Sequence, residues 1–450
     1  MEKHPQNGSA IQLSDHFTTK RLLRFALPSI AMMLFTSIYG VVDGFFISNY
    51  VGESGFASVN LIYPYCMIFA ALGSVFGVGG SALVALIRGE GRKEESNRVF
   101  SMLIYTLAIV SAVTCLVAQL LLPRVTRALG ATDSLYDNCI LYGRIILSTQ
   151  PAFLMQYAFQ SFMITAERPK TGFIITLCAG VLNMIADWLF VAVFGWGIAG
   201  AAAATCMGQL IGGIAPVVYI LTHKDLPIRF TKTRFMPRML GRAVTNGLAD
   251  GITNIAMSAV NMVYNVRLMH YLGEYGVSAY GIIMYVNFFF VAVYLGYAMG
   301  VAPVYSFNRG ADNRAELKNV FRRSFVFVAV ATVILTGFAE LAAGGIADLF
   351  AGYDADFRIL AVRALRLYSL AYLLSGFNIF VSSLFAALNN GVTAGILSLL
   401  RTLVFQLAAV LILPELIGSD GIWLAIVVAE GCIFIISYIL LKKEQPKYGY

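Results

Sequence analysis

Charged residues are scarce in this chain. Lysine, arginine, aspartate and glutamate make up 12% of its 450 residues, whereas hydrophobic residues make up 59%. A typical soluble domain carries about 25% charged residues, which cover much of its surface. Too few charges are present here to cover a soluble protein of this size, so the outer surface must face lipid.

Histidine and cysteine, on which many metal and redox sites depend, are also few. The four histidines form no HExxH motif, and the six cysteines form no CxxC pair. The apolar segments contain no paired nucleophile and base. These features argue against an intramembrane enzyme and against a disulfide framework, and we expect no cofactor.

The chain consists instead of long apolar runs bounded by charged residues. Each run can cross a hydrocarbon core about 30 Å thick. The runs are continuous, whereas the strands of a membrane β-barrel alternate in polarity, so the runs predict helices. We therefore expect an all-α membrane protein with twelve transmembrane helices. They are predicted near residues 22–47, 57–86, 99–122, 139–165, 172–194, 198–222, 243–270, 278–307, 320–344, 364–388, 393–414 and 421–441.

The distribution of basic residues predicts how these helices are oriented. If the N-terminus is cytoplasmic, 24 of the 32 lysines and arginines fall on the cytoplasmic side. The positive-inside rule then places both termini in the cytoplasm of a bacterial cell, with the protein in the plasma (inner) membrane. The net charge of +8 reflects this topology and contact with anionic lipids, and it does not indicate a nucleic-acid partner.

An internal repeat relates the two halves of the chain. Residues 50–100, shifted by 221 positions, align with residues 271–321 without a gap. Shared hydrophobicity could align the apolar positions alone. The shift also aligns turn glycines and loop charges, such as Arg88 with Arg309, so it indicates a duplication.

Six helices per repeat give the two halves the same orientation in the membrane. Such parallel repeats are related by a pseudo-twofold axis along the membrane normal, and the substrate path lies at their interface. We predict an N-lobe at residues 1–225 and a C-lobe at residues 226–450, joined by the basic loop 223–242. This is the architecture of a rocking two-lobe transporter, expected here as a monomer.

Several polar residues fall inside the predicted N-lobe helices. Asp43 lies late in the first helix, Asn183 and Asp187 lie one turn apart on the fifth, and Thr205 lies early in the sixth. All four are expected in the outer half of the membrane. Their oxygens could hold a proton shared between the acids, or a Na⁺ ion, and they could also form a hydrogen-bonded knot between packed helices. Two buried acids without a basic partner are costly, which favours an ion site.

The repeat provides an internal comparison for this cluster. The four positions correspond in the C-lobe to Tyr264, Phe405, Ala409 and Ala429. A structural requirement of the fold would be expected in both halves. A single ion site in the N-lobe is therefore the simpler interpretation.

Two roles are open to other polar residues within the spans. They could line a substrate cavity, or they could form hydrogen bonds between helices worth about 1 kcal/mol each. The candidates for the substrate cavity are Tyr39, Gln156, Gln160, Gln209, Asn261 and Asn265. No role is assigned to Asp250, Glu340, Arg401 or Glu430.

The chain resembles a multidrug and toxic compound extrusion (MATE) transporter, and within that family the DinF-like branch. The resemblance covers nearly the whole sequence and rests on the stretches LPSIAMMLFTSIYGVVDGFFISNYVGESGFASV and FGVGGSALVALIRGEGRKEESNRVF. It implies that the ion site combines Asp43, Asn183, Asp187 and Thr205, with Tyr142 in the same network. It also implies export of amphipathic, often cationic, organic compounds in exchange for H⁺ or Na⁺.

Two other kinds of transport protein stay open. A lipid-linked oligosaccharide flippase of the same superfamily would need basic residues in its central cavity to hold a pyrophosphate. Arg401 is the only well-centred arginine, against two acids in the N-lobe, so the flippase ranks below the antiporter. A channel would not require a repeat joined by a basic linker, although the sequence does not exclude one.

Overall fold

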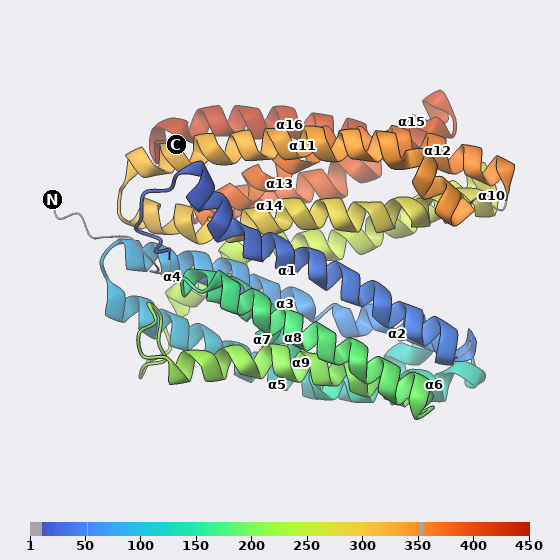
Figure 1. Cartoon of the computed structure of the whole chain (residues 1–450), viewed down its shortest axis with the longest axis horizontal. Helices are drawn as coiled ribbons and strands as arrows, with labels where there is room; N and C mark the ends of the chain where they lie inside the picture. Colours follow the sequence, from blue (N-terminus) through green and yellow to red (C-terminus); the bar gives the residue numbers. More distant parts are fainter. Residues whose placement is uncertain (1–10, 52, 352–353) are drawn as a thin grey trace.

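The structure is a computed structural model that describes residues 11–51, 53–351 and 354–450. Every regular element within these residues is a helix, as the apolar runs predict (Figure 1). The first half contains α1 (Thr19–Phe46), η1 (Ile47–Val51), α2 (Glu53–Met67), α3 (Ala70–Ser74), η2 (Val75–Gly79), α4 (Gly80–Gly89), α5 (Lys93–Ala128), α6 (Asp133–Ser148), α7 (Gln150–Thr165), α8 (Pro169–Asp187), η3 (Trp188–Val193) and α9 (Gly197–Thr222). The second half contains α10 (Pro237–Gly310), α11 (Arg314–Ala351), α12 (Ala355–Ser369), α13 (Tyr372–Ala387), α14 (Gly391–Leu399), η4 (Leu400–Phe405), α15 (Gln406–Ile417) and α16 (Asp420–Tyr448).

Local sequence signals mark where several helices begin. The side chains of Thr18, Asp354 and Asn390 each accept the backbone N–H of the residue three positions on, which satisfies a donor that the helix itself leaves free. Two other helices, α8 and α10, begin at Pro169 and Pro237, because proline suits the first helical position.

The helices account for the twelve predicted spans. In the described part of the chain, nine helical segments are long and apolar enough to cross a membrane, and the pair α12 and α13, bent by 43°, makes a tenth. One of the nine, α10, has two legs that meet at Gly273, whose φ of 61° favours glycine. The short helices α6 and α7 are interrupted at Thr149, within the predicted span 139–165. The predicted fold class is therefore confirmed.

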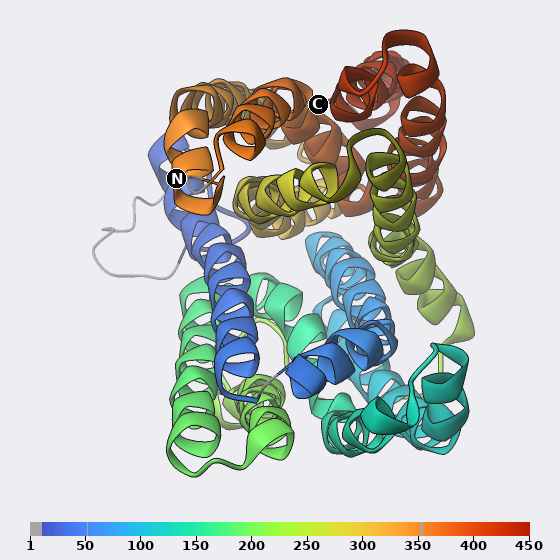
Figure 2. The same ribbon diagram turned by 90° about the vertical axis from the view of Figure 1, so that its right-hand side faces the viewer.

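The two halves form two bundles that lie side by side (Figure 2). Helices α1 to α9 make one bundle and α10 to α16 make the other, and α1 and α4 pack against α10 across the boundary. We call the end of the molecule at which α1 begins and α16 ends the terminal end. The sequence division at residues 225 and 226 stays a prediction.

A pair of equivalent contacts reveals the axis between the bundles. A Cβ atom on Gly89 would lie 2.0 Å from the carbonyl oxygen of Phe307, and one on Gly310 would lie 2.0 Å from that of Leu86. The repeat shift of 221 residues converts the first contact into the second. Such reciprocal contacts are expected across a twofold axis, so the bundles are related as the duplication predicts.

The close approach between the halves is concentrated near the terminal end. In addition to the reciprocal pair, a Cβ atom on Gly79 would lie 1.9 Å from the carbonyl oxygen of Ala243, and one on Gly247 would lie 2.1 Å from that of Val75. Only residues without a side chain let the backbones approach this closely. The structure therefore has its two lobes tightly closed on each other in this half of the molecule.

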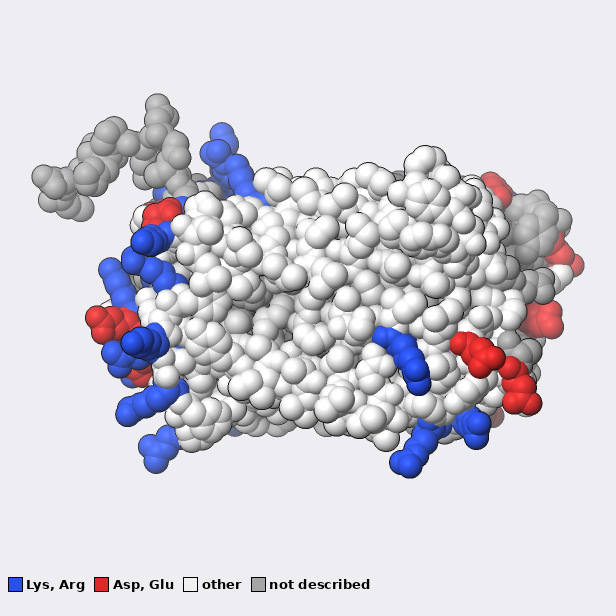
Figure 3. Space-filling model, turned by 90° about the horizontal axis from the view of Figure 1, so that it is seen from below, with Lys and Arg blue, Asp and Glu red and all other residues white. Residues whose placement is uncertain are grey.

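Charged side chains gather at the two ends of the molecule. The view in Figure 3 shows a broad central belt with almost no lysine, arginine, aspartate or glutamate. Basic side chains crowd the terminal end, which is at the left in that view. The belt fits a hydrocarbon layer, because uncharged side chains can face lipid without the cost of burying charge.

Candidate functional site

A small cavity lined by polar and apolar side chains lies inside the first bundle. It measures about 60 Å³ and is enclosed by α1, α2, α7, α8 and α9. A volume of this size can hold a few water molecules or a small ion, whereas pockets for drug-sized ligands measure about 300–1,000 Å³. Six residues predicted to belong to an ion or substrate site line it: Tyr39, Asp43, Gln156, Asn183, Thr205 and Gln209.

The structure brings Asp43 and Thr205 together across two helices. The Thr205 hydroxyl lies 3.4 Å from Asp43 Oδ1 and 3.1 Å from the carbonyl oxygen of Ala201, one turn earlier on α9. A hydroxyl has only one hydrogen to donate, so these two acceptors compete for it. The Asp43 carboxylate is therefore held by a weak, exchangeable contact.

Asp187 and Asn183 lie on the face of α8 that adjoins this cavity. Both side chains are almost fully buried, at 0% and 4% exposure. Asp187 is close enough to Asp43 and Asn183 to interact with them electrostatically. Among the described residues, however, neither carboxylate oxygen of Asp187 and neither polar atom of the Asn183 amide has a hydrogen-bond partner. Buried polar atoms are normally paired, so the cluster is poised to receive a proton, an ion or water.

The backbone next to Asp187 is irregular. Asp187 is the last residue of α8, and the wider π-helical turn η3 follows it directly. Such turns interrupt regular helices and are frequent at functional sites. The acid therefore lies where the helix is wider than a regular α-helix.

Tyr142 of α6 belongs to the same neighbourhood. Its side chain is 1% exposed and packs in an apolar cluster with Ile47 and Cys206. It lies within electrostatic range of Asp43. Its hydroxyl has no hydrogen-bond partner among the described residues, so it is available to the acid cluster.

Two glycines that sequence reasoning did not identify shape the cavity. A Cβ atom on Gly208 of α9 would lie 3.1 Å from the Cβ atom of Asn183, and one on Gly180 of α8 would lie 3.1 Å from the Tyr39 ring. The signal for Gly208 in the sequence is its spacing from Gly212 in α9, which favours close helix packing. Tyr63 of α2 also lines the cavity, and no pattern in the sequence distinguished it from other tyrosines.

The residues predicted to line a substrate cavity are divided between the two bundles. Gln156 and Gln209 face the first cavity, where Gln209 accepts a hydrogen bond of 2.7 Å from the hydroxyl of Thr149. Asn261 lines a different cavity, in the second bundle, and accepts a hydrogen bond of 2.8 Å from Tyr280. Gln160 is half-buried and Asn265 is exposed, and neither lines these two cavities.

An ion pair lines the cavity of the second bundle. It measures about 120 Å³, and both Arg401 and Glu430 line it. The Arg401 guanidinium lies 2.8 Å from Glu430 Oε1, and the Asn378 amide donates a 2.6 Å hydrogen bond to the other carboxylate oxygen. Glu430 is 1% exposed. This acid has a basic partner, whereas the polar neighbours of Asp187 are a second acid, Asp43, and the uncharged amide of Asn183.

The other two acids without an assigned role form contacts between helices. Asp250 lines the second cavity and lies within hydrogen-bonding reach of Ser74 in the other bundle. Glu340 of α11 accepts a hydrogen bond of 2.5 Å from the hydroxyl of Ser369 at the end of α12.

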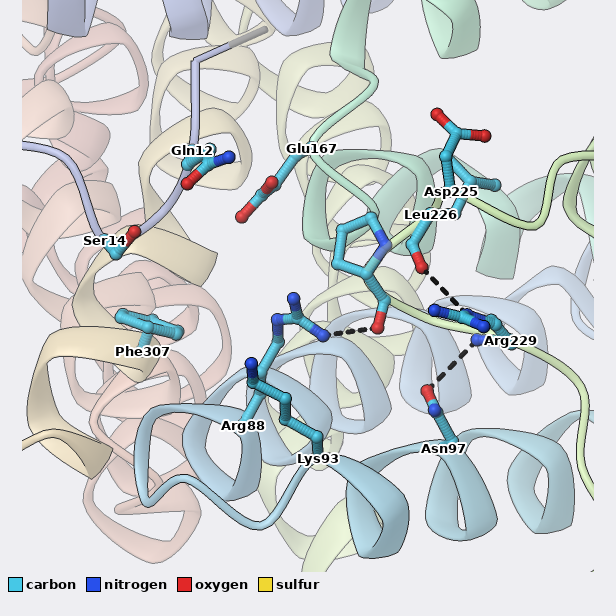
Figure 4. Close-up of a pocket in the computed structure, with 11 residues that line it drawn as sticks. Gln12, Ser14, Arg88, Lys93, Asn97, Glu167, Asp225, Leu226, Arg229 and Phe307 are labelled. Carbon is cyan, nitrogen blue, oxygen red and sulfur yellow. Dashed lines mark hydrogen bonds between the residues drawn. The ribbon is translucent and has the colours of Figure 1, made fainter. Parts of the chain in front are cut away.

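A pocket at the terminal end is larger than either cavity within the bundles. It measures about 490 Å³, and charged and polar side chains make up most of its lining (Figure 4). Arg88 donates to the carbonyl oxygen of Pro227, and Glu167 accepts the N–H of Leu13 at 3.0 Å. Burial raises the pKa of Glu167, and the Leu13 N–H and the positive charge of Arg88 oppose that rise. These bonds fasten the N-terminal segment and the α9–α10 linker over the closed end, and none of the predicted site residues lines this pocket.

Comparison with known proteins identifies the family. The sequence profile of the MatE family matches residues 28–189 and 251–411, one segment in each half. The multidrug export protein MepA of Staphylococcus saprophyticus is 22% identical over 413 residues, which cover 91% of this chain and 90% of that protein. MepA of Staphylococcus aureus strain MSSA476 is 22% identical over 423 residues, 94% of this chain and 93% of that protein.

Solved structures show the same fold. A MATE crystal structure in complex with MaL6 superposes with a TM-score of 0.92 at 21% identity, covering 98% of this chain and 99% of that chain. An outward-facing multidrug resistance MATE family transporter of the MOP superfamily gives a TM-score of 0.91 at 21% identity, covering 99% of both chains. The protein is thus a helical membrane transporter and not an enzyme. It belongs to the MatE family, as the resemblance in its sequence predicts. Its place in the DinF-like branch stays a prediction.

Proposed function

We propose that this protein exports amphipathic, often cationic, organic compounds in exchange for H⁺ or Na⁺. Support for the substrate class comes from the multidrug export proteins that it resembles over nine-tenths of its length. Support for ion exchange comes from the cavity of the first bundle, which is too small for such a compound but large enough for an ion.

One observation carries the coupling proposal: the buried acids of the two lobes have different partners. Among the described residues Asp187 has no basic partner, and its polar neighbours are Asp43, which has a weak contact with Thr205, and Asn183. In the other lobe, Arg401 and Asn378 hold Glu430. A cation or proton that enters the first cluster removes an unfavourable charge, whereas one that enters the second must break an ion pair. Coupling therefore belongs to the N-lobe.

The driving force is adequate for such an exchange. One positive charge moving inward gains about 2.3 kcal/mol per 100 mV of membrane potential, and each pH unit adds about 1.4 kcal/mol per proton. Loading the acids changes the charge and packing between α1, α8 and α9. The exchange works if the loaded form favours the outward-facing state and binds drug less tightly there, because a ligand shifts a conformational equilibrium only by binding two states differently.

Alternating access requires the lobes to part at the terminal end. The reciprocal contacts of Gly89 and Gly310 close that end, and rocking of the two lobes about an axis in the membrane plane would open it. We take the terminal end to be cytoplasmic, since most basic residues lie there. The closed contacts then correspond to an outward-facing state, and the chain acts as a monomer in a bacterial plasma membrane.

The flippase alternative loses its main support. It depended on Arg401 as a site for a pyrophosphate, and Glu430 neutralises that guanidinium at 2.8 Å. A second anion would have to displace a buried carboxylate. No other observation favours this function over drug export.

Transport in proteoliposomes tests the proposal. With pH and Na⁺ gradients imposed separately, one of them should drive uphill export of an amphipathic cation. Asp43→Asn keeps the side chain's shape and removes its charge, so it should abolish driven export while drug binding persists with a weaker response to pH or Na⁺. Tyr264→Phe, at the equivalent position of the C-lobe, should leave coupling unchanged. Driven export that survives in Asp43→Asn would exclude this acid from the mechanism.

A further inference from the structure

A groove runs between α1 and α11 from the terminal end into the uncharged belt. It measures about 430 Å³ and joins helices that belong to different halves of the protein. Its upper rim is polar and basic, and its floor is apolar. The lining residues are Thr19, Leu23, Asn319, Arg322, Arg323, Val326, Phe327 and Val330.

The positive charge at the rim is not neutralised. Arg323 donates hydrogen bonds to Asn319 Oδ1 at 2.7 Å and to Thr19 Oγ1 at 2.6 Å, and both acceptors are uncharged. Arg322 is exposed and has no acidic partner among the described residues. The rim therefore presents two guanidinium groups, one of them fixed between α1 and α11, to an anion.

The nearest acid along α11 is already engaged. Glu316 accepts the backbone N–H of Phe17 at 2.9 Å, pairs with His16 at 2.7 Å and accepts from the amide of Asn319 at 2.8 Å. These contacts turn its carboxylate toward the N-terminal segment. It is not available to neutralise Arg322 or Arg323.

The floor continues below the arginines on the same face of α11. Val326 is 54% exposed and Val330 is 52% exposed, and Leu23 of α1 forms the opposite wall. Val330 lies eight residues beyond Arg322, which corresponds to about 12 Å along the helix axis. A basic rim at interface depth above an apolar channel matches a phosphate headgroup above an acyl chain.

The internal repeat shows what covers this face in the other half. The 221-residue shift pairs Arg322 with Ser101 and Arg323 with Met102 on α5. There the α9–α10 linker lies on the helix: the N–H of Thr231 donates to Ser101 Oγ at 2.9 Å, and the N–H of Met236 lies 3.2 Å from Met102 Sδ.

The linker touches the first apolar position of that face without covering it, since Tyr105 is 48% exposed. Phe230 stacks on Tyr105 with a centroid distance of 6.1 Å, and the shift pairs Tyr105 with Val326. On α11 the described residues of the N-terminal segment and the start of α1 reach only to Arg323, and Val326 and Val330 are exposed, as Tyr105 and Ile109 are at the equivalent positions of α5. The halves therefore differ at the rim: Ser101 and Met102 are buried, at 0% and 2% exposure, whereas Arg322 at the equivalent of Ser101 is exposed.

We propose that one anionic glycerophospholipid occupies this groove, with its phosphate on Arg322 and Arg323 and an acyl chain against Leu23, Val326 and Val330. The lipid comes from the leaflet at the terminal end, which is the cytoplasmic leaflet in the orientation proposed above. Because α1 and α11 belong to different lobes, the bound lipid bridges them at the end where they are closed. It therefore favours the closed arrangement of the terminal end.

The test measures lipid binding to the purified, delipidated full-length protein in a neutral detergent. Phosphatidylglycerol and phosphatidylcholine are titrated separately, and bound lipid is counted by native mass spectrometry. We expect one phosphatidylglycerol to bind in preference to phosphatidylcholine. Each basic residue near a membrane surface contributes enough that the double variant Arg322→Gln, Arg323→Gln should bind phosphatidylglycerol about thirtyfold more weakly.

A matched control removes two charges elsewhere at the same end. Lys232→Gln with Arg234→Gln alters two exposed residues of the linker and should leave binding unchanged. Arg322→Gln alone breaks no hydrogen bond in the structure, so it reports on a folded protein and should weaken binding about fivefold. Val326→Trp fills the floor with both charges kept, and should also weaken binding.

Three results would overturn the site. If the linker control and the groove variant lose the same amount of phosphatidylglycerol binding, the lipid is attracted to the basic end as a whole and not to the groove. Equal binding of phosphatidylcholine would remove the role of the arginines. Displacement of the lipid by inorganic phosphate, with Val326→Trp neutral, would mean a phosphate site without an acyl groove. The assay involves no transport, so its outcome is independent of the proposed antiport.

Discussion

Asp187 and Glu430 are both buried acids, and they should respond to truncation in opposite ways. Asp187 is 0% exposed, and neither carboxylate oxygen has a hydrogen-bond partner among the described residues. An unpaired buried polar group costs about 1–3 kcal/mol. Asp187→Ala removes that cost beside an existing cavity, so we expect the free energy of unfolding to rise by about 1–3 kcal/mol. The same change should abolish ion-driven export.

Glu430→Ala is the matched comparison. Glu430 is 1% exposed, accepts from Arg401 at 2.9 Å and accepts from Asn378 at 2.6 Å. Its removal leaves the half-buried Arg401 guanidinium without a counter-ion, and breaking a buried pair costs about 3–5 kcal/mol. This variant should therefore be markedly destabilised.

Thermal and denaturant unfolding of both variants in the same detergent would measure the difference. If the free energy of unfolding rises for Asp187→Ala and falls for Glu430→Ala, the N-lobe acid is retained for function at the expense of stability. If Asp187→Ala destabilises the protein as much as Glu430→Ala does, the reasoning is refuted. The N-lobe cluster would then be a structural knot between helices.

Three further predictions concern the gate, the site and the topology. Gly89→Ala places a methyl group 2.0 Å from the Phe307 carbonyl oxygen, so thiol reagents should reach the terminal end more readily; unchanged access would exclude this contact from the gate. Gly208→Val, built where a Cβ atom lies 3.1 Å from that of Asn183, should displace the amide and weaken the response of drug affinity to pH or Na⁺ several-fold, while a wild-type response would remove Asn183 from the site. Lys232→Cys in a cysteine-free background should be labelled only from the cytoplasm, and labelling from outside intact cells would reverse the orientation.

The positions of the spans could be predicted from the sequence because lipid imposes a simple requirement on composition. The breaks within spans could not. The bend between α12 and α13 and the interruption at Thr149 depend on packing, and an apolar run looks the same whether its helix is straight or broken. The helix predicted at residues 139–165 begins earlier in the structure, at Asp133, since its first turns are polar and do not extend the apolar run.

The acid cluster was predicted more completely than the cavity around it. Charged residues inside a membrane are rare enough to stand out, and the structure brings Asp43 and Thr205 into contact and places Asp187 beside them. Glycine and tyrosine are common in membrane helices. The contributions of Gly208 and Tyr63 therefore became visible only when α8, α9 and α2 were packed together. An amide such as Asn261 stands out equally in an apolar run whichever of the two cavities it lines.

The reciprocal contact of Gly89 with Phe307 and of Gly310 with Leu86 has an evolutionary consequence. It is the kind of interface that two identical six-helix chains would make as a homodimer, in which every substitution appears twice. Fusion of the duplicated genes released that constraint, because each copy of a position could then mutate alone. One half could then keep acids without a basic partner while the other acquired an ion pair. The two halves would share one fold and differ in their buried charged residues.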